Sequence, residues 1–195
     1  MIPAFLLVLI AVIYRVVMGP FVQLESAWLS NFAPLAAIAL CSAAYFPPKY
    51  KFAVPLVLLL VSDIILNLHY GASLLSPLIV GRYLALIAVG CIGVAMQNRA
   101  SFKTLLPASI VGSLLLYLVA NTCSRLSDPG YVKNLAGFIQ AQTIGLPAYS
   151  ATPTWMFLRN SIVSDLIFTS LFVFCVQIGR SPERARAARA IPRAA

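Results

Sequence analysis

Six long apolar stretches, joined by polar connections, make up most of the chain. They cover residues 2–20, 31–47, 53–70, 78–97, 104–121 and 153–178. A helix needs about 20 apolar residues to cross a bilayer core of about 30 Å, and each stretch is close to that length. The pattern therefore predicts an all-α polytopic membrane protein with six transmembrane helices.

Composition supports this class. The 195 residues are 61% hydrophobic and 10% charged, with a mean hydropathy of +0.93, whereas about a quarter of the residues in soluble domains are charged. We expect one six-helix transmembrane bundle over residues 1–178 and a basic tail over 179–195. The first stretch lacks the basic start and the small-residue cleavage site of a signal peptide, so it is predicted to be an uncleaved helix.

Basic residues in the connections predict the orientation. Nine of them lie on one side of the predicted bundle: Lys49, Lys51, Arg99, Lys103, Arg180, Arg184, Arg186, Arg189 and Arg193. Only Arg125 and Lys133 lie in the connection on the other side. Because Lys and Arg accumulate in cytoplasmic loops, both termini are predicted to face the cytoplasm.

Two segments outside the spans have a pattern of their own. The tail RSPERARAARAIPRAA is rich in Ala and Arg, which predicts a frayed helix lying on anionic lipid headgroups. No aromatic residues alternate with its arginines, so nucleic acid is not an expected partner. The long outer connection, 122–152, contains YVKNLAGFIQAQTIG, which is too short to span and predicts a surface helix or a lid.

The last apolar stretch carries the most unusual residues, Arg159, Asn160 and Asp165. An ionised side chain near the centre of a spanning helix costs about 2.5–3.5 kcal/mol, so it is retained where protein or water receives it. On a helical wheel a broad arc holds most of the polar residues, and Arg159 points elsewhere. The arc consists of Asn160, Ser161, Ser164 and Asp165, with Thr169 at its edge. This arc is predicted to face inward.

With this topology, the polar residues of the spans gather in the outer half of the membrane. Eight lie near the outer surface: Arg15, Asn31, Asn67, His69, Arg82, Asn121, Arg159 and Asn160. Asp63 and Asp165 lie deeper, near mid-membrane. We expect these ten residues to line a ligand-binding cavity that opens to the outside above an apolar floor. Three arginines against two aspartates favour a small polar solute, with an anion as one option.

A purely structural interpretation stays open for the same residues. Buried Arg and Asp residues in membrane bundles often pair across helices without any ligand. His69 is expected to bond to backbone near a helix end, and Asn31 and Asn121 are candidates for helix caps. In that case the chain is a structural or assembly subunit of a larger respiratory or photosynthetic membrane complex.

Catalytic, metal and cofactor chemistry are not expected. The four cysteines lie far apart without a CxxC motif, and His69 is the one histidine, so no metal or haem site and no cofactor are predicted. The cysteines are interpreted as small core residues. No GxSxG or HExxH motif is present, and we expect no enzyme. A quinone-handling role that passes protons through Tyr70, His69 and Asp63 is the enzymatic alternative.

Four segments together resemble an uncharacterised bacterial family of integral membrane proteins, known only as a domain of unknown function. They are NFAPLAAIALCSAAYF (31–46), Ser62-Asp63, YVKNLAG (131–137) and FLRNSIVSDLIF (157–168). The most specific feature is Arg159-Asn160 followed five residues later by Asp165. The resemblance implies a multi-pass protein of the bacterial inner membrane and supplies no activity.

Helix number, topology and the outer polar cluster also resemble the substrate-binding S components of energy-coupling-factor transporters. This second resemblance implies a cavity, open to the outside, for a vitamin-like solute and a partner membrane subunit. Many S components meet that partner through small residues spaced AxxxA in the first helix. Here that spacing occurs in the second stretch, at Ala39 and Ala43.

Overall fold

The computed structural model describes residues 2–25, 31–71, 76–148 and 150–190, without the side chains of residues 18, 20–25 and 180–190. Every regular element in these ranges is a helix, which confirms the predicted all-α class. The elements are α1 (Ile2–Glu25), α2 (Leu35–Tyr45), α3 (Ala53–Tyr70), α4 (Pro77–Met96), the 3-10 turn η1 (Gln97–Arg99), α5 (Phe102–Ser127), α6 (Leu135–Thr143) and α7 (Thr154–Ala190).

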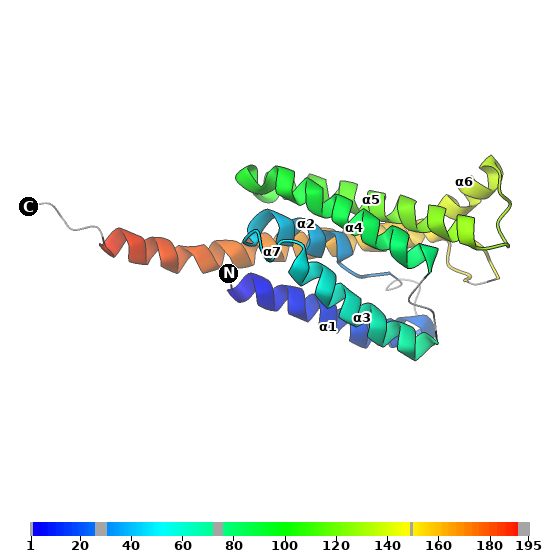
Figure 1. Ribbon diagram of the computed structural model, residues 1–195, viewed down its shortest axis with the longest axis horizontal. Coiled ribbons are helices and arrows are strands. Elements are labelled where there is room, and N and C mark those ends of the chain that lie inside the picture. Colours follow the sequence, from blue (N-terminus) through cyan, green and yellow to red (C-terminus); the bar gives the residue numbers. More distant parts are fainter. Residues whose placement is uncertain (1, 26–30, 72–75, 149, 191–195) are drawn as a thin grey trace, which may run out of the picture.

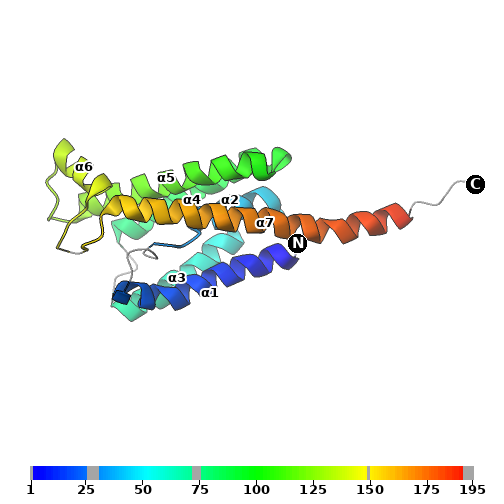
Figure 2. The same cartoon turned by 180° about the vertical axis from the view of Figure 1, so that it is seen from behind.

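The long helices run along one axis in alternating directions (Figures 1 and 2). The start of α1 and the far end of α7 lie at the same end of the bundle, and α6 lies at the opposite end. The helix α6 confirms a surface helix within the connection 122–152. Its Asn134 N-cap accepts a hydrogen bond from the amide of Gly137 at 2.9 Å, which satisfies one of the free N–H groups of its first turn.

In the part of the chain that the structure describes, four helical segments are long and apolar enough to cross a membrane: Ala53–Tyr70, Pro77–Arg99, Phe102–Ser127 and Thr154–Gly179. The other two predicted spans are shorter apolar segments, Ile2–Val17 and Leu35–Tyr45. The predicted second span, 31–47, is too long at both ends. The backbone of Asn31 has φ +59°, Pro34 precedes the first turn of α2, and Phe46 is extended, so only eleven residues are helical.

Helix boundaries differ from the prediction elsewhere too. Helix α1 continues to Glu25 and α5 to Ser127, beyond the predicted ends at 20 and 121. Helix α7 passes the predicted end at 178 and continues to Ala190 without a break, so the backbone of the tail extends the last span. The predicted contacts of its basic side chains with lipid headgroups fall on undescribed side chains, and Arg193 lies outside the described residues.

Apolar packing is concentrated around α2. Ten of its eleven residues, Ala36 to Tyr45, are buried, and α2 packs against α4, α5 and α7. At Gly93 of α4, a Cβ atom would lie 2.3 Å from the carbonyl oxygen of Leu40, so glycine permits this close approach of two helices. Cys41 is buried, whereas Cys91 is exposed, so the prediction of core cysteines holds only in part.

Candidate functional site

An ionic cluster joins three helices around Asp63 of α3. Arg15 of α1 donates from Nη2 to Oδ1 of Asp63 at 2.5 Å, and Arg82 of α4 donates from Nη2 to Oδ2 at 2.7 Å. The hydroxyl of Tyr83 donates to the same Oδ2 at 2.9 Å. Arg15 also donates from Nη1 to Ser62, whose hydroxyl donates to the carbonyl oxygen of Leu59 at 2.8 Å.

The charge of this Asp63 cluster is not balanced. Two guanidinium groups share one carboxylate, which leaves a net charge of +1 among these three side chains. The Asp63 side chain is 4% exposed, that of Arg15 11% and that of Arg82 24%, so Arg82 is the most accessible member. Arginine carries five N–H donors, and Arg82 uses one of them on Asp63. The cluster therefore retains N–H groups that can donate hydrogen bonds to a second anion.

Asp165 of α7 has a different set of partners. Its Oδ1 accepts from the amide of Ala37, in the first turn of α2, at 2.8 Å, and its Oδ2 lies 2.6 Å from the hydroxyl of Ser113 of α5. Asp165 is 1% exposed. Within the described residues no ion pair reaches it. This carboxyl group replaces the missing side-chain cap of α2 and ties α2, α5 and α7 together.

The lack of an ion-pair partner for Asp165 among the described residues makes its ionised form costly in free energy. An ionised aspartate at the centre of a spanning helix costs about 2.5–3.5 kcal/mol. The dipole at a helix N-terminus stabilises a nearby negative charge by about 0.3–1 kcal/mol, and by about 2 kcal/mol in a favourable buried geometry. The α2 terminus therefore does not by itself offset the cost of a charge at Asp165.

A third polar group surrounds the N-terminal end of α7. Arg159 donates from Nε and Nη2 to Oδ1 of Asn160 at 3.2 and 3.0 Å, and its guanidinium carbon lies 6.0 Å from the centre of the Trp155 ring. Asn31 donates from Nδ2 to Ser161 at 2.8 Å, and the Ser161 hydroxyl donates back to the Asn31 carbonyl oxygen at 3.3 Å. This exchange attaches the segment before α2 to α7.

The polar arc predicted on the last span does face inward. Asn160, Ser164, Asp165 and Thr169 are buried, and Ser161, the fifth residue of the arc, is partly buried. In contrast, Asp63, Asn67 and Tyr70, which follow one another at i, i+4 and i+7 spacing on α3, become more exposed along the helix: Asp63 is buried, Asn67 is partly buried and Tyr70 is exposed. The Nδ2 atom of Asn67 is itself buried and has no hydrogen-bond partner in the described part of the chain.

The remaining candidates lie apart from these clusters. His69 is exposed, and its ring makes an edge contact with that of Tyr70 at 5.1 Å between centroids. Asn121 is partly buried within α5, six residues before the helix ends, so it is not the cap of that helix. Asn31 does not cap α2 either, because the N-cap position belongs to Pro34.

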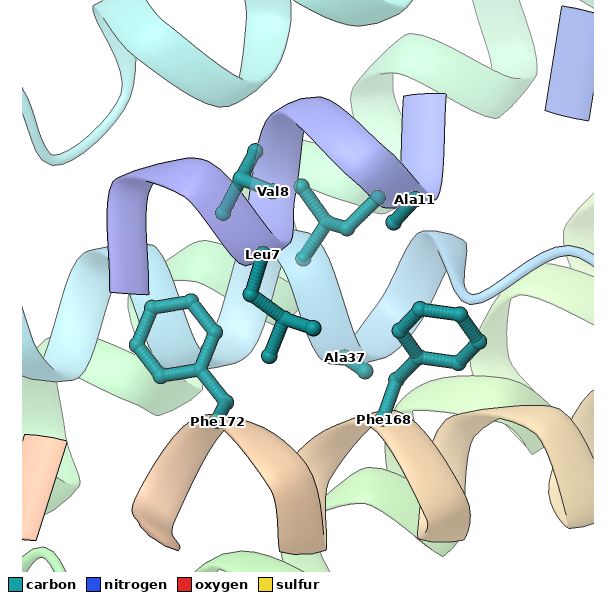
Figure 3. Close-up of a pocket in the computed structure, with 7 residues that line it drawn as sticks. Leu7, Val8, Ala11, Ala37, Phe168 and Phe172 are labelled. Carbon is teal, nitrogen blue, oxygen red and sulfur yellow. The ribbon is translucent and has the colours of Figure 1, made fainter. Parts of the chain in front are cut away.

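A small cavity lies between α1, α2 and α7, and none of the ten candidate residues lines it (Figure 3). Its walls are apolar: Leu7, Val8, Ala11, Ala37, Ile38, Phe168 and Phe172. The volume of about 10 Å³ is at the lower limit for one water molecule.

The structure thus groups six of the ten candidates into one ionic cluster and one polar group at the N-terminal end of α7, with Asp165 in a third site. Arg15, Asp63 and Arg82 form the first group, and Asn31, Arg159 and Asn160 form the second. Sequence reasoning did not single out Tyr83 and Ser113. Tyr83 is the chain neighbour of Arg82, whereas nothing in the apolar surroundings of Ser113 distinguishes it.

Several long apolar helices with buried ionic and polar groups between them indicate an integral membrane protein. The chain matches a family of unknown function, DUF6580, over residues 1–185. It therefore belongs to that family. A comparison with curated proteins found no match, and neither did a comparison with solved structures.

Proposed function

We propose that this chain is a non-enzymatic membrane subunit that binds a small polar solute entering from the outer face, as an S component does. An anion is the favoured class of solute. The observation that carries this proposal is the Asp63 cluster, in which Arg15 and Arg82 share one carboxylate. A net positive charge within an apolar bundle is costly unless a further anion or water receives it.

Donors outnumber acceptors at this cluster, which supports the choice of an anion. Arg82 has four N–H groups beyond the one that meets Asp63, and the buried Nδ2 of Asn67 lies one turn along α3 from Asp63. The planar fork of a guanidinium matches a carboxylate or a phosphate with two parallel hydrogen bonds. A solute with one such group would neutralise the cluster.

The proposed topology has six spans with both termini in the cytoplasm of a bacterial cell, in its inner membrane. The alternating helix directions and the common end of α1 and α7 support it (Figure 1). The basic residues of the connections and tail support the same orientation. In this arrangement α6 and the Arg159 group face the outside, and the basic tail contacts lipid headgroups or a partner membrane subunit.

A binding role also suits the surroundings of the one histidine. Catalysis by a base and a nucleophile requires the two groups within hydrogen-bond reach. His69 is exposed beside Tyr70, whereas Asp63 is buried among Arg15, Arg82 and Tyr83. Because the two residues have different surroundings and partners, we do not propose a proton relay through His69 and Asp63.

A thermal-shift screen tests the solute proposal. The purified chain is heated with vitamins, nucleobases and organic acids, because a bound ligand at 100 times its Kd raises stability by about 2.7 kcal/mol. We expect stabilisation by an anion in the unaltered protein and in Arg99→Gln, which changes an exposed basic residue of η1. Arg82→Gln should abolish it. The proposal fails if no compound stabilises the protein, or if Arg82→Gln leaves the shift unchanged.

A structural or assembly subunit of a larger complex is the second candidate, and the setting of Asp165 favours it. Both oxygen atoms of this buried carboxyl group already have partners within the chain, on α2 and α5. The two candidates differ in a simple observation. A structural subunit purifies in one complex of fixed stoichiometry, and neutralising Asp63 lowers its stability without changing the uptake of any solute.

A further inference from the structure

The hydroxyl of Ser113 has two acceptors for its one hydrogen atom. It lies 2.9 Å from the carbonyl oxygen of Ser109 and 2.6 Å from Oδ2 of Asp165. A serine hydroxyl carries one donor and two lone pairs, so it cannot donate along both contacts at once. If Ser113 donates to Ser109, the hydrogen atom of its contact with Asp165 must come from the aspartate.

We infer that Asp165 is a proton-binding site and that it holds its proton on Oδ2 in this arrangement of the helices. The protonated group donates to Ser113, and Ser113 donates to the carbonyl oxygen of Ser109. Meanwhile Oδ1 accepts from the amide of Ala37. Each contact then has one donor and one acceptor, and the network contains no buried charge.

The surroundings of Asp165 favour the neutral acid. Helix α2 contains no Asp, Glu, Lys, Arg or His, and neither does α6. In α5 the basic residues Lys103 and Arg125 are ten and twelve positions from Ser113, or about 15 and 18 Å along the helix axis. The titratable groups on the helices packed against α7 are Tyr14, Arg15 and Glu25 on α1, Cys41 and Tyr45 on α2, and Tyr117 and Cys123 on α5 besides its two basic residues.

Among the described contacts, no basic side chain of these helices forms an ion pair with Asp165. Arg15, the basic residue of α1, is bonded to Ser62 and Asp63. The two intramembrane aspartates thus differ in kind. Asp63 is an anion held by two guanidinium groups, and Asp165 is an acid held by neutral donors and acceptors. This inference stands on the Asp165 contacts alone and does not depend on the solute proposed above.

Isotope labelling gives a direct test, because the chain has only three aspartates: Asp63, Asp128 and Asp165. The full chain is prepared in lipid bilayers at neutral pH with ¹³C-labelled aspartate. Infrared and solid-state NMR spectra then separate protonated carboxyl groups from carboxylates. We expect one protonated signal and two carboxylate signals in the unaltered protein, and loss of the protonated signal in Asp165→Asn.

Two further variants keep the test decisive if Asp165→Asn does not fold. Asp128 lies in the connection after α5, where its Oδ1 accepts from the amide of Gly130 at 2.7 Å. The protonated signal should persist in both Asp63→Asn and Asp128→Asn, which assigns it to Asp165 by elimination. Three carboxylate signals in the unaltered protein, or loss of the protonated signal in either of these variants, would overturn the inference.

Discussion

Replacing Asp63 with asparagine should destabilise the bundle more than any other single change in its ionic cluster. The substitution keeps the shape of the side chain but raises the net charge of the cluster from +1 to +2, because Arg15 and Arg82 both lose their counter-ion. Breaking a buried pair in this way costs about 3–5 kcal/mol. For a chain of 195 residues, 1 kcal/mol corresponds to about 2–4 °C in Tm, so we expect a decrease of roughly 6–20 °C.

Arg82→Gln is the matched comparison. It removes a charge from the same cluster but leaves the neutral pair of Arg15 and Asp63, and its side chain is the most accessible of the three. We expect a loss of about 1 kcal/mol or less, as for ion pairs near solvent. Thermal unfolding of both variants in the same detergent or nanodisc measures the difference. If Asp63→Asn costs no more than Arg82→Gln, the charge reasoning is wrong.

Three smaller predictions use the same unfolding assay. Asp165→Asn should lower the unfolding free energy by less than about 1 kcal/mol, since the side-chain amide can form both hydrogen bonds of Asp165. Asp165→Ala should lower it by about 1–3 kcal/mol, because the backbone amide of Ala37 loses its partner. Gly93→Val should cost about 1–3 kcal/mol by overpacking against α2, while Ala95→Val on an exposed face of α4 stays within about 0.5 kcal/mol. Asn31→Ala should be about 1 kcal/mol less stable than Asn31→Gly, because only glycine adopts φ +59° without strain. Equal stability within any of these pairs would contradict the reason given for it.

Hydrophobic periodicity was sufficient to predict the helical class and the inward face of α7. A run of apolar residues long enough to span is a strong signal, and the arc containing Asn160 and Asp165 repeats at helical spacing. Helix ends were less predictable, because their limits depend on local backbone geometry. Pro34 and the positive φ of Asn31 shorten α2, while α5 and α7 continue through polar residues that composition alone assigns to loops.

The sequence alone did not predict which charged and polar residues contact each other between helices. The charge count within the spans is visible from the sequence, but the assignment of both Arg15 and Arg82 to Asp63 depends on where α1 and α4 lie relative to α3. The partners of Asp165 were even less predictable, since one of them is a backbone N–H group of α2, and every residue except proline has such a group. A serine within an apolar run, such as Ser113, usually bonds to its own helix.

The unbroken length of α7 has a mechanical consequence. Its 37 residues make a rod of about 55 Å, well beyond the hydrocarbon thickness of about 30 Å. From Asp165 to Ala190 the rod measures about 37 Å, so a tilt of about 10° at the aspartate would displace the C-terminal end of α7 by roughly 6 Å. A change in packing around Asp165 can in this way move the far end of the same helix.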